Sequence, residues 1–517
     1  MVAVLFYYLC LVKKSFRHIL SVIALALLPS GVIAQESRSD LVLKFETAGM
    51  AGTGDHAPFW HTSNRQGLPS TAANNGYMHF AALGNMLLPA GFDMSYGADL
   101  GLGAGLQTDW YVHQLYLDLN YKWLGVSAGM KERWSDKNSS LSTGALTWSG
   151  NSRPIPEVRA GIPEFVSIPF LGNWVSLKGH VGFGRLTDDK WRSEHSGNVY
   201  MDGLLFHSKS AFLRFGDAER FPLEVSIGLE MNNVFGGVRH NLAANTATRY
   251  PSDLEAYWTA LFPFHEVEQQ GNEDGDNLGS WHLNFDYTQN GWHVGAYYEH
   301  FYEDHSSWLG IEYKYNTEGE KDYIFFGFRR NWFDGLFGIE VNAPDNIRFF
   351  RNAVFEFMNT RGLCGPICHS ASCNSDGMYV IEEVDGRDGM YNHGINGSYS
   401  HHGYAIGNPV LISPVYSNYN GFRSNRARMF HLGVDGGITD NIDYRVLATT
   451  TTHWGQYGAP LKEIEHVTSV MLELSYLMGD NYDWKFSLSG AMDFDSGDLL
   501  GNNKGVMLTI TKIWKVL

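Results

Sequence analysis

His61 and Ser63 are the residues best suited to catalysis, because a histidine near a serine can accept the hydroxyl proton and make the serine a nucleophile. On a strand these two positions share a face. No second motif that would complete such a site is visible, and Pro58 favours a loop or a strand start. Asp188 and Asp189 are sequence neighbours that would point to opposite faces of a strand, which does not suit a paired-carboxylate protease. The sequence therefore predicts no catalytic residue, no cofactor and no enzymatic activity.

Two regions mix aromatic rings with amide, imidazole and guanidinium groups, a combination that suits carbohydrate. Sugars stack their C–H faces on aromatic rings, and their hydroxyls pair with polar side chains. We therefore predict carbohydrate contact by Trp191, Arg192, Tyr391, Asn392, His393, Tyr399, His401, His402 and Tyr404. The alternative interpretation is that these residues are ordinary membrane-interface aromatics and polar side chains that fill a lumen.

Three cysteines, Cys364, Cys368 and Cys373, lie close together in the sequence, with His369 between them. In an oxidising envelope such a cluster is typical of a disulfide that closes a loop, with the third thiol free or paired elsewhere. A Cys3His zinc site has tolerable spacing, but oxidation competes with metal binding by thiols. We predict a disulfide among the three cysteines and no metal site.

The elements that must position these residues are two-faced strands. Apolar side chains alternate with small or polar ones over residues 97–106, 114–121 and 223–230. This period of two is typical of β-strands with one oily face and one polar face. Because the pattern recurs from residue 97 to the last strand, at 506–510, one type of sheet accounts for most of the chain.

Tight turns join several of these strands into hairpins. Residues 281–287 and 292–298 flank Gln289, Asn290 and Gly291, and Asn-Gly is the strongest short hairpin signal. Similar pairs occupy 430–448 and 470–488. Ser252 and Glu255 form a possible capping box, which predicts a short helix through Leu261.

Length and composition favour a membrane barrel over a soluble fold. A soluble β-sandwich of 517 residues would normally be divided by linkers, and none is apparent. A barrel can remain one closed sheet, with its apolar face toward lipid and its polar face toward the lumen. Aromatic residues make up 14% of the chain, which suits the belts at the two membrane interfaces. The predicted fold is all-β, a transmembrane antiparallel barrel with minor helical inserts in contact with outer-membrane lipid.

The N-terminus resembles a secretory signal. Lys13, Lys14 and Arg17 precede an apolar stretch over 19–28, and small residues end at Ala34. We predict a signal peptide at 1–34 and a single barrel domain at 35–517. Loss of these three positive charges changes the formal net charge from −17 to −20, which disfavours nucleic acid as a partner.

Several ordered runs resemble the capsule assembly protein family Wzi in its Bacteroidetes form. They are residues 54–67 (GDHAPFWHTSNRQG), 153–159 (RPIPEVR), 162–165 (IPEF), 178–182 (KGHVG), 278–281 (LGSW), 391–394 (YNHG), 406–409 (IGNP) and 425–428 (NRAR). The resemblance implies an outer-membrane barrel of about 18 strands with some helical material. It also implies a lectin that helps to hold or assemble capsular or extracellular polysaccharide at the cell surface. A passive porin and an outer-membrane hydrolase of phospholipase type are the alternatives, and the sequence leaves the sugar and the oligomeric state open.

Overall fold

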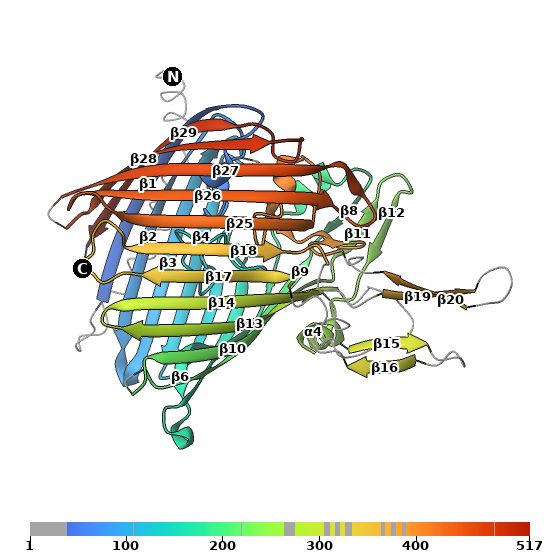
Figure 1. The fold of residues 1–517 in the computed structure, drawn as a ribbon, viewed down its shortest axis with the longest axis horizontal. Helices are drawn as coiled ribbons and strands as arrows, with labels where there is room; N and C mark the ends of the chain where they lie inside the picture. The colour runs from blue at the N-terminus through green and yellow to red at the C-terminus, as the bar shows by residue number, and fades with distance from the viewer. Residues whose placement is uncertain are drawn as a thin grey trace.

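The protein is an 18-stranded antiparallel β-barrel (Figure 1). The computed structural model describes residues 39–516 except 107, 219, 263–274, 304–310, 316–320, 326–332, 363–367, 374–378, 385–388 and 480. Each barrel strand pairs with the next barrel strand along the chain, and β29 pairs with β1 to close the sheet. The barrel strands are β1 (Ser39–Thr53), β2 (Asn75–Leu88), β3 (Phe92–Ala104), β4 (Trp110–Tyr121), β5 (Leu124–Met130), β6 (Glu157–Ser167), β7 (Val175–Arg185), β9 (Leu205–Phe215), β10 (Leu223–Phe235), β13 (Asp276–Gln289), β14 (Trp292–Glu303), β17 (Gly335–Asn342), β18 (Asn352–Asn359), β25 (Arg426–Gly437), β26 (Ile442–Gly455), β27 (Pro460–Met478), β28 (Trp484–Asp495) and β29 (Lys504–Lys515). The predicted fold class is confirmed.

The barrel is oily on its outside and polar on its inside. On β27, Leu472 and Leu474 are exposed, whereas Glu473 and Ser475, which alternate with them, are buried. The same alternation follows β4, where Leu117 faces outward and Asp118 inward. Because a soluble protein would bury its apolar face, this inverted arrangement is the one that a lipid environment requires.

The hairpins that the sequence predicts are present. Gln289 pairs with Trp292 across the Asn290-Gly291 turn, and both turn residues have positive φ, as a two-residue hairpin turn requires. All connections at the barrel end that carries the Asn290-Gly291 turn contain at most nine residues, and the longest is 343–351 between β17 and β18. The opposite end carries the long connections, at 54–74, 131–156, 186–204, 236–275, 304–334 and 360–425.

Smaller elements belong to the long connections. They are the short helices α2 (Phe59–Thr62), α3 (Asp189–His195) and α4 (Leu254–Leu261), the 3-10 turn η5 (Pro414–Tyr416), and the short strands β8 (Val199–Asp202), β11 (Val238–Asn241), β12 (Thr246–Arg249), β15 (Ile311–Tyr315), β16 (Lys321–Phe325), β19 (Cys368–Cys373), β20 (Tyr379–Val384), β21 (Asn392–His393), β22 (Gly397–Ser398), β23 (Ser400–His401) and β24 (Tyr404–Ala405). Two further 3-10 turns, η2 (Pro89–Gly91) and η3 (Pro169–Leu171), lie instead in short connections at the other end of the barrel. The helix predicted through Leu261 is present as α4. Its N-cap is Asp253, whose side chain accepts the Ala256 N–H at 3.1 Å, so the predicted Ser252 cap is wrong by one residue.

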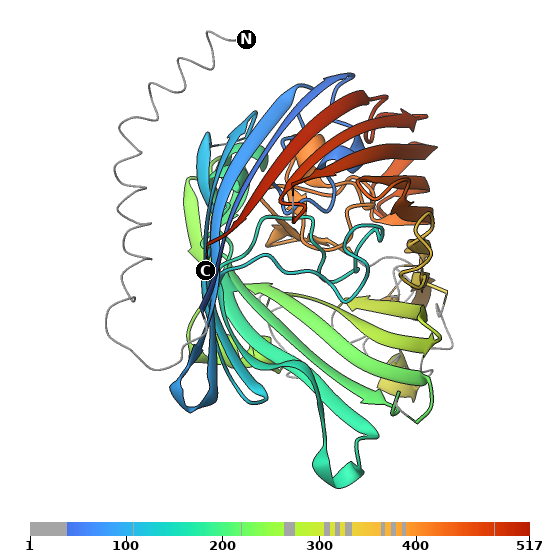
Figure 2. The ribbon, with the colours of Figure 1, turned by 90° about the vertical axis from the view of Figure 1, so that its left-hand side faces the viewer.

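Three of the long connections fold back into the barrel and form what we call the plug: residues 54–74, 131–156 and 389–425. Figure 2 shows the second and third of these segments inside the ring of strands. Apolar plug residues such as Trp60, Leu146 and Tyr391 share a buried cluster with wall residues such as Leu447 and Met471. The core of this protein therefore lies within the lumen, between plug and wall.

No helix in the described part of the chain is long and apolar enough to cross a membrane. The predicted signal peptide at 1–34 lies outside the described residues.

A lysine on the outer face tests the inverted arrangement. Leu472 lies on β27 and is 50% exposed, so in water Leu472→Lys would be almost neutral. In a bilayer we expect the substitution to lower the free energy of unfolding by about 2–4 kcal/mol near the midplane. Urea unfolding in lipid vesicles measures the change. Thr246→Lys on the exposed strand β12 is the control, and an equal effect at both sites would contradict the proposed lipid contact.

Candidate functional site

The first plug segment is anchored to the barrel wall through α2. The Phe59 N–H donates to Asp493 on β28 at 2.9 Å, and the Trp60 indole donates to Thr449 on β26 at 3.2 Å. His61 Nε2 lies 3.0 Å from Ser489 Oγ, which is also on β28. His61 and Ser63 therefore belong to a helical turn and its C-cap, not to one face of a strand, and His61 is paired with the wall. The prediction that the protein is not an enzyme stays a prediction.

Inward-pointing carboxylates hold the second plug segment. Glu356 on β18 accepts hydrogen bonds from Ser142 Oγ at 2.6 Å and from the Thr143 N–H and Oγ1 at 2.8 and 2.7 Å. Glu299 on β14 accepts the Leu146 N–H at 2.9 Å and pairs with Lys137 at 2.6 Å. The wall thus satisfies backbone groups of an irregular segment that would otherwise be buried without partners.

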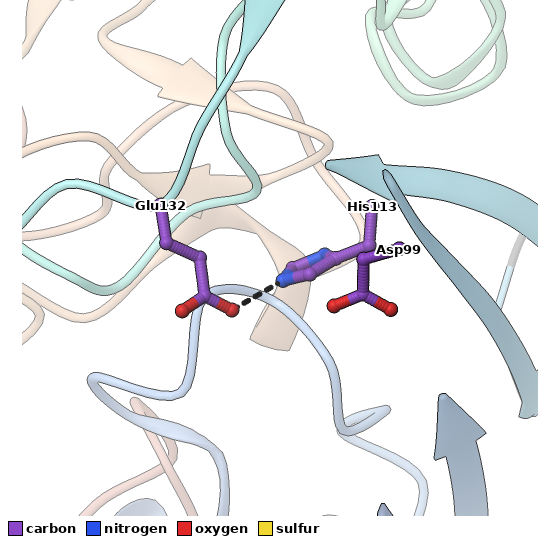
Figure 3. Close-up of side chains that lie close together, drawn as sticks. All are labelled: Asp99, His113 and Glu132. Carbon is purple, nitrogen blue, oxygen red and sulfur yellow. Dashed lines mark hydrogen bonds and ion pairs between the residues drawn. The ribbon is translucent and has the colours of Figure 1, made fainter. Parts of the chain in front are cut away.

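The same segment begins beside a cluster with metal-ligand chemistry. Asp99 on β3, His113 on β4 and Glu132 each place one ligand atom within 4.8 Å of the others, and they are the one such group found among the described residues (Figure 3). The sequence predicts no metal site, and these three residues are far apart in the chain.

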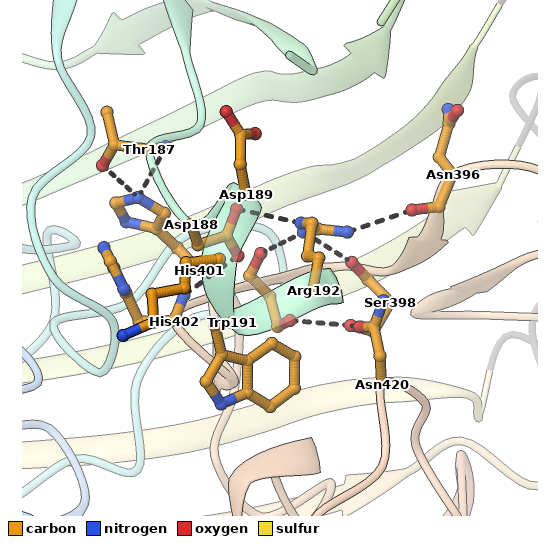
Figure 4. Close-up of polar contacts among 12 residues, drawn as sticks. Thr187, Asp188, Asp189, Trp191, Arg192, Asn396, Ser398, His401, His402 and Asn420 are labelled. Carbon is orange, nitrogen blue, oxygen red and sulfur yellow. Dashed lines mark hydrogen bonds and ion pairs between the residues drawn. The ribbon is translucent and has the colours of Figure 1, made fainter. Parts of the chain in front are cut away.

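The predicted sugar-contact residue Arg192 lies on α3 and is fully buried (Figure 4). Its Nε donates to Asp188 Oδ1 at 2.9 Å, and its two Nη atoms donate to carbonyl oxygens of the third plug segment. The acceptors are Asn396 at 3.0 Å, Ser398 at 3.3 Å and Ser400 at 2.7 Å. Asp188 also accepts the His402 N–H at 3.0 Å. This buried ion pair therefore joins the 186–204 connection to the plug.

The predicted aromatic contacts are buried as well. Trp191 stacks on His195 at 4.6 Å between ring centroids. Tyr391 donates to Leu146 O, Tyr399 donates to Thr147 O at 2.8 Å, and Tyr404 donates to Pro69 O at 2.6 Å. Each tyrosine hydroxyl is thus used to fasten one plug segment to another. In this conformation the side chains offer little surface to a ligand, and their contact with sugar stays a prediction.

Two buried histidines of the plug, His61 and His401, and the half-buried His402 are held in the neutral form. Burial, followed by the charge of Arg65, lowers the pKa of His61 to about 3. Burial also lowers the pKa of His401, which bonds to Arg153 O at 3.0 Å and to Thr187 Oγ1 at 3.0 Å. The pKa of His402 is lowered well below its ordinary value, first by burial and then by its neighbour His401.

Asn392 and His393 keep some exposure, and an unpredicted residue, Tyr419, lies near Asn392. Tyr419 is 59% exposed, and its ring and Asn392 Oδ1 both approach Gly421. The Asn392 amide exchanges two hydrogen bonds with the Phe422 backbone, at 2.9 and 2.8 Å, which fixes it on the plug. Sequence reasoning missed Tyr419 because its neighbours, Asn418 and Asn420, are typical of a turn rather than of a binding loop.

The cysteine predictions fall mostly outside what the structure describes. Cys364 lies outside the described residues, and Cys368 and Cys373 are the two ends of β19, of which only the backbone is described. The disulfide stays a prediction.

No protein-family model matches the chain, and no curated protein is similar to it. Among solved structures, the chain is similar to Wzi of Escherichia coli, with a TM-score of 0.54 and 12% identity over 90% of this chain and 83% of that chain. That protein is described as an outer-membrane protein involved in group 1 capsule assembly and as a carbohydrate-binding β-barrel. This likeness shows the fold alone. OccK5 (OpdH) of Pseudomonas aeruginosa has a TM-score of 0.46 at 9% identity, covering 93% and 98% of the two chains, and OccAB2 of Acinetobacter baumannii has 0.48 at 8%, also covering 93% and 98%. The predicted resemblance to Wzi is thus confirmed for the 18-stranded outer-membrane barrel.

Removing the carboxylate partner of Arg192 tests the structural role of the α3 cluster. In Asp188→Ala a buried guanidinium loses its counter-ion, and we expect the free energy of unfolding to fall by about 3–5 kcal/mol. Chemical denaturation in detergent micelles measures the loss. Lys190→Ala is the control on the same helix, because its exposed pair with Glu194 is worth at most about 1 kcal/mol. Equal losses in the two variants would contradict the assigned role.

The neutral histidines make the stability of the plug sensitive to acid. His61 has a folded pKa of about 3 and an ordinary value of 6.5, so protons bind the unfolded chain preferentially between these values. We expect the contribution of His61 to the free energy of unfolding to be constant above pH 6.5. On acidification toward pH 3 this contribution is lost, by up to about 1.4 kcal/mol per pH unit. Unfolding of the wild type and of His61→Gln at about pH 7.5 and about pH 5 isolates this contribution. If the free energy of unfolding of the wild type, relative to that of His61→Gln, stayed constant or rose between about pH 7.5 and about pH 5, the assignment would be refuted.

Proposed function

We propose that this protein is an outer-membrane carbohydrate-binding barrel that helps to attach or assemble capsular or extracellular polysaccharide at the cell surface. The runs that resemble the Wzi family support the proposal, because several of them form the plug. Residues 54–67, 391–394 and 406–409 meet there, and Tyr391 receives the Asn408 N–H at 2.8 Å. Escherichia coli Wzi, which shares the barrel fold, is described as carbohydrate-binding.

The observation that carries the proposal is the plug. A diffusion porin needs a continuous aqueous path, whereas a barrel that presents a surface to a polymer needs only a rigid outer face. Here three chain segments cross the lumen and share an apolar core, and the first two also bond to carboxylates of the wall. This arrangement disfavours the porin alternative.

The exposed end of the plug supplies a candidate sugar surface. Tyr419 offers an aromatic face, Asn392 and His393 offer polar groups, and all three belong to the third plug segment. The segment enters the barrel from the end with long connections, which in outer-membrane barrels is the extracellular end. The buried residues Arg192, Tyr399 and His401 would then act by holding this surface in place rather than by touching sugar.

Deletion of the gene tests the proposed role. We expect the deletion strain to synthesise polysaccharide at the normal rate and to release it into the medium, and we expect the purified barrel to bind that polysaccharide. The same preparation should leave planar lipid bilayers closed, because the plug crosses the lumen and is bonded to its wall. Normal retention of polymer together with large channel conductance would replace the proposal with the porin alternative.

A single aromatic truncation tests the surface. In Tyr419→Ala we expect polysaccharide binding to weaken by about tenfold or more with the thermal unfolding temperature unchanged, because an exposed ring contributes stacking and little stability. Tyr482→Ala is the matched control, since this tyrosine is also about half exposed but lies in the short turn between β27 and β28. Unchanged binding by Tyr419→Ala would exclude this face.

A further inference from the structure

We propose that Asp99, His113 and Glu132 form a binding site for one first-row divalent cation such as Zn²⁺, and that the ion links the plug to the barrel wall. The set consists of two carboxylates and one imidazole (Figure 3). Zinc and its neighbours in the first transition row accept this mixture of oxygen and nitrogen ligands. The inference is independent of the proposed carbohydrate function.

A β-bulge brings the imidazole to the site. The pairing of β3 with β4 runs from Asp99 opposite Gln114 to Leu100 opposite Val112, so His113 is the extra residue. Because of the bulge, His113 and Gln114 are both buried in the lumen, although they are neighbours in the chain. Bulges that redirect a side chain in this way are frequent beside functional sites. Both residues reach the start of the second plug segment, since Gln114 Oε1 accepts the Glu132 N–H at 3.0 Å and His113 Nε2 lies 2.8 Å from Glu132 Oε1.

The second observation is an unsatisfied imidazole. The side chain of His113 is fully buried, and its Nδ1 has no hydrogen-bond partner among the described residues. The Tyr111 hydroxyl, whose ring lies 6.1 Å from that of His113, is also buried without such a partner. Buried polar atoms are nearly always paired, and the ring nitrogen opposite a metal-binding one usually has an outer partner such as a water, so an imidazole that binds the ion through Nε2 would have a water at Nδ1.

Neighbouring residues bond to Asp99 and fix its carboxylate, as the outer partners of metal-binding carboxylates do. His79 Nδ1 lies 2.9 and 3.1 Å from the two carboxylate oxygens of Asp99. The other ring nitrogen of His79 lies 3.5 Å from Glu46, which also accepts a hydrogen bond from Tyr77 at 3.0 Å. Such outer partners orient ligating carboxylates in metal sites.

The geometry needs a small rearrangement to hold the ion. Tetrahedral ligands about 2.1 Å from zinc lie about 3.4 Å apart, so His113 Nε2 and Glu132 Oε1 must open from 2.8 Å and the wider separations, of up to 4.8 Å, must close. Glu132 can supply this movement, because its side chain is 27% exposed and follows the end of β5. The ion would replace the proton that His113 and Glu132 now share. Since Asp99 and His113 belong to the wall and Glu132 to the plug, binding would stabilise the closed lumen.

Zinc titration of the full-length protein in detergent tests the proposal. After removal of metal by a chelator, we expect the wild type to bind one equivalent of Zn²⁺ and to unfold at a higher temperature when zinc is present. In Glu132→Gln and His113→Ala we expect affinity to fall at least about tenfold and the zinc-dependent thermal shift to disappear. Co²⁺ in place of Zn²⁺ should give a visible absorption band that both variants lose.

Two control variants exclude other sites. His240→Ala removes a histidine–aspartate hydrogen bond of 2.9 Å outside the barrel, and we expect it to bind zinc normally. Cys368→Ser removes one residue of the cysteine cluster, the other place in the chain with zinc-ligand spacing, and we expect the same result. Absence of stoichiometric binding by the wild type, or binding that survives both Glu132→Gln and His113→Ala, would overturn the proposal and leave a hydrogen-bonded pair only. Glu132→Gln preserves size, and its unfolding temperature without zinc verifies that it folds.

Discussion

The structure depends on one constraint: a closed sheet in lipid must turn its apolar side chains outward, so most polar side chains of its membrane-spanning part point into an enclosed space. Leu472 and Glu473 are adjacent in the chain and meet opposite environments. In water such a sheet would hide leucine and expose glutamate, whereas here the glutamate, the histidines and the serines gather in the lumen. Their polar groups must then be satisfied by one another, by water or by chain that enters the lumen.

The plug meets this requirement in a specific way. It is irregular chain, and irregular chain carries unpaired N–H groups that are costly to bury. Glu356, Glu299 and Asp493 project from three separate strands and accept N–H groups of the plug directly. The polar wall and the irregular plug therefore complement each other, since each supplies the hydrogen-bond partners that the other lacks. Charge-assisted bonds of this kind are also stronger than neutral ones, which favours a single position of the plug.

The strands could be predicted from the sequence because alternation is a local signal, and the turn at Asn290-Gly291 fixes its own register. The plug could not be predicted, because its segments have no period and their partners lie hundreds of residues away. Arg192 illustrates the difficulty: an arginine among aromatic and amide residues looks the same in sequence whether it binds sugar or is fully occupied by Asp188 and three carbonyl oxygens. His113 was missed for a different reason. The bulge at this residue breaks the period of two, so a histidine that alternation assigns to the lipid face lies in the lumen.

The seam between β1 and β29 has a consequence for biogenesis. The first plug segment follows β1 directly, and the His56 N–H donates to Asn503, the residue before β29, at 3.0 Å. Phe59 binds Asp493 on the last hairpin, and the Asn503 amide donates to the same carboxylate at 3.2 Å. The first and last strands of the barrel, and the segments beside them, thus meet both in the wall and in the interior. Ring closure and seating of the N-terminal insert are consequently coupled, since an assembly intermediate that lacks the final hairpin also lacks the anchors of that insert at Asp493 and Asn503.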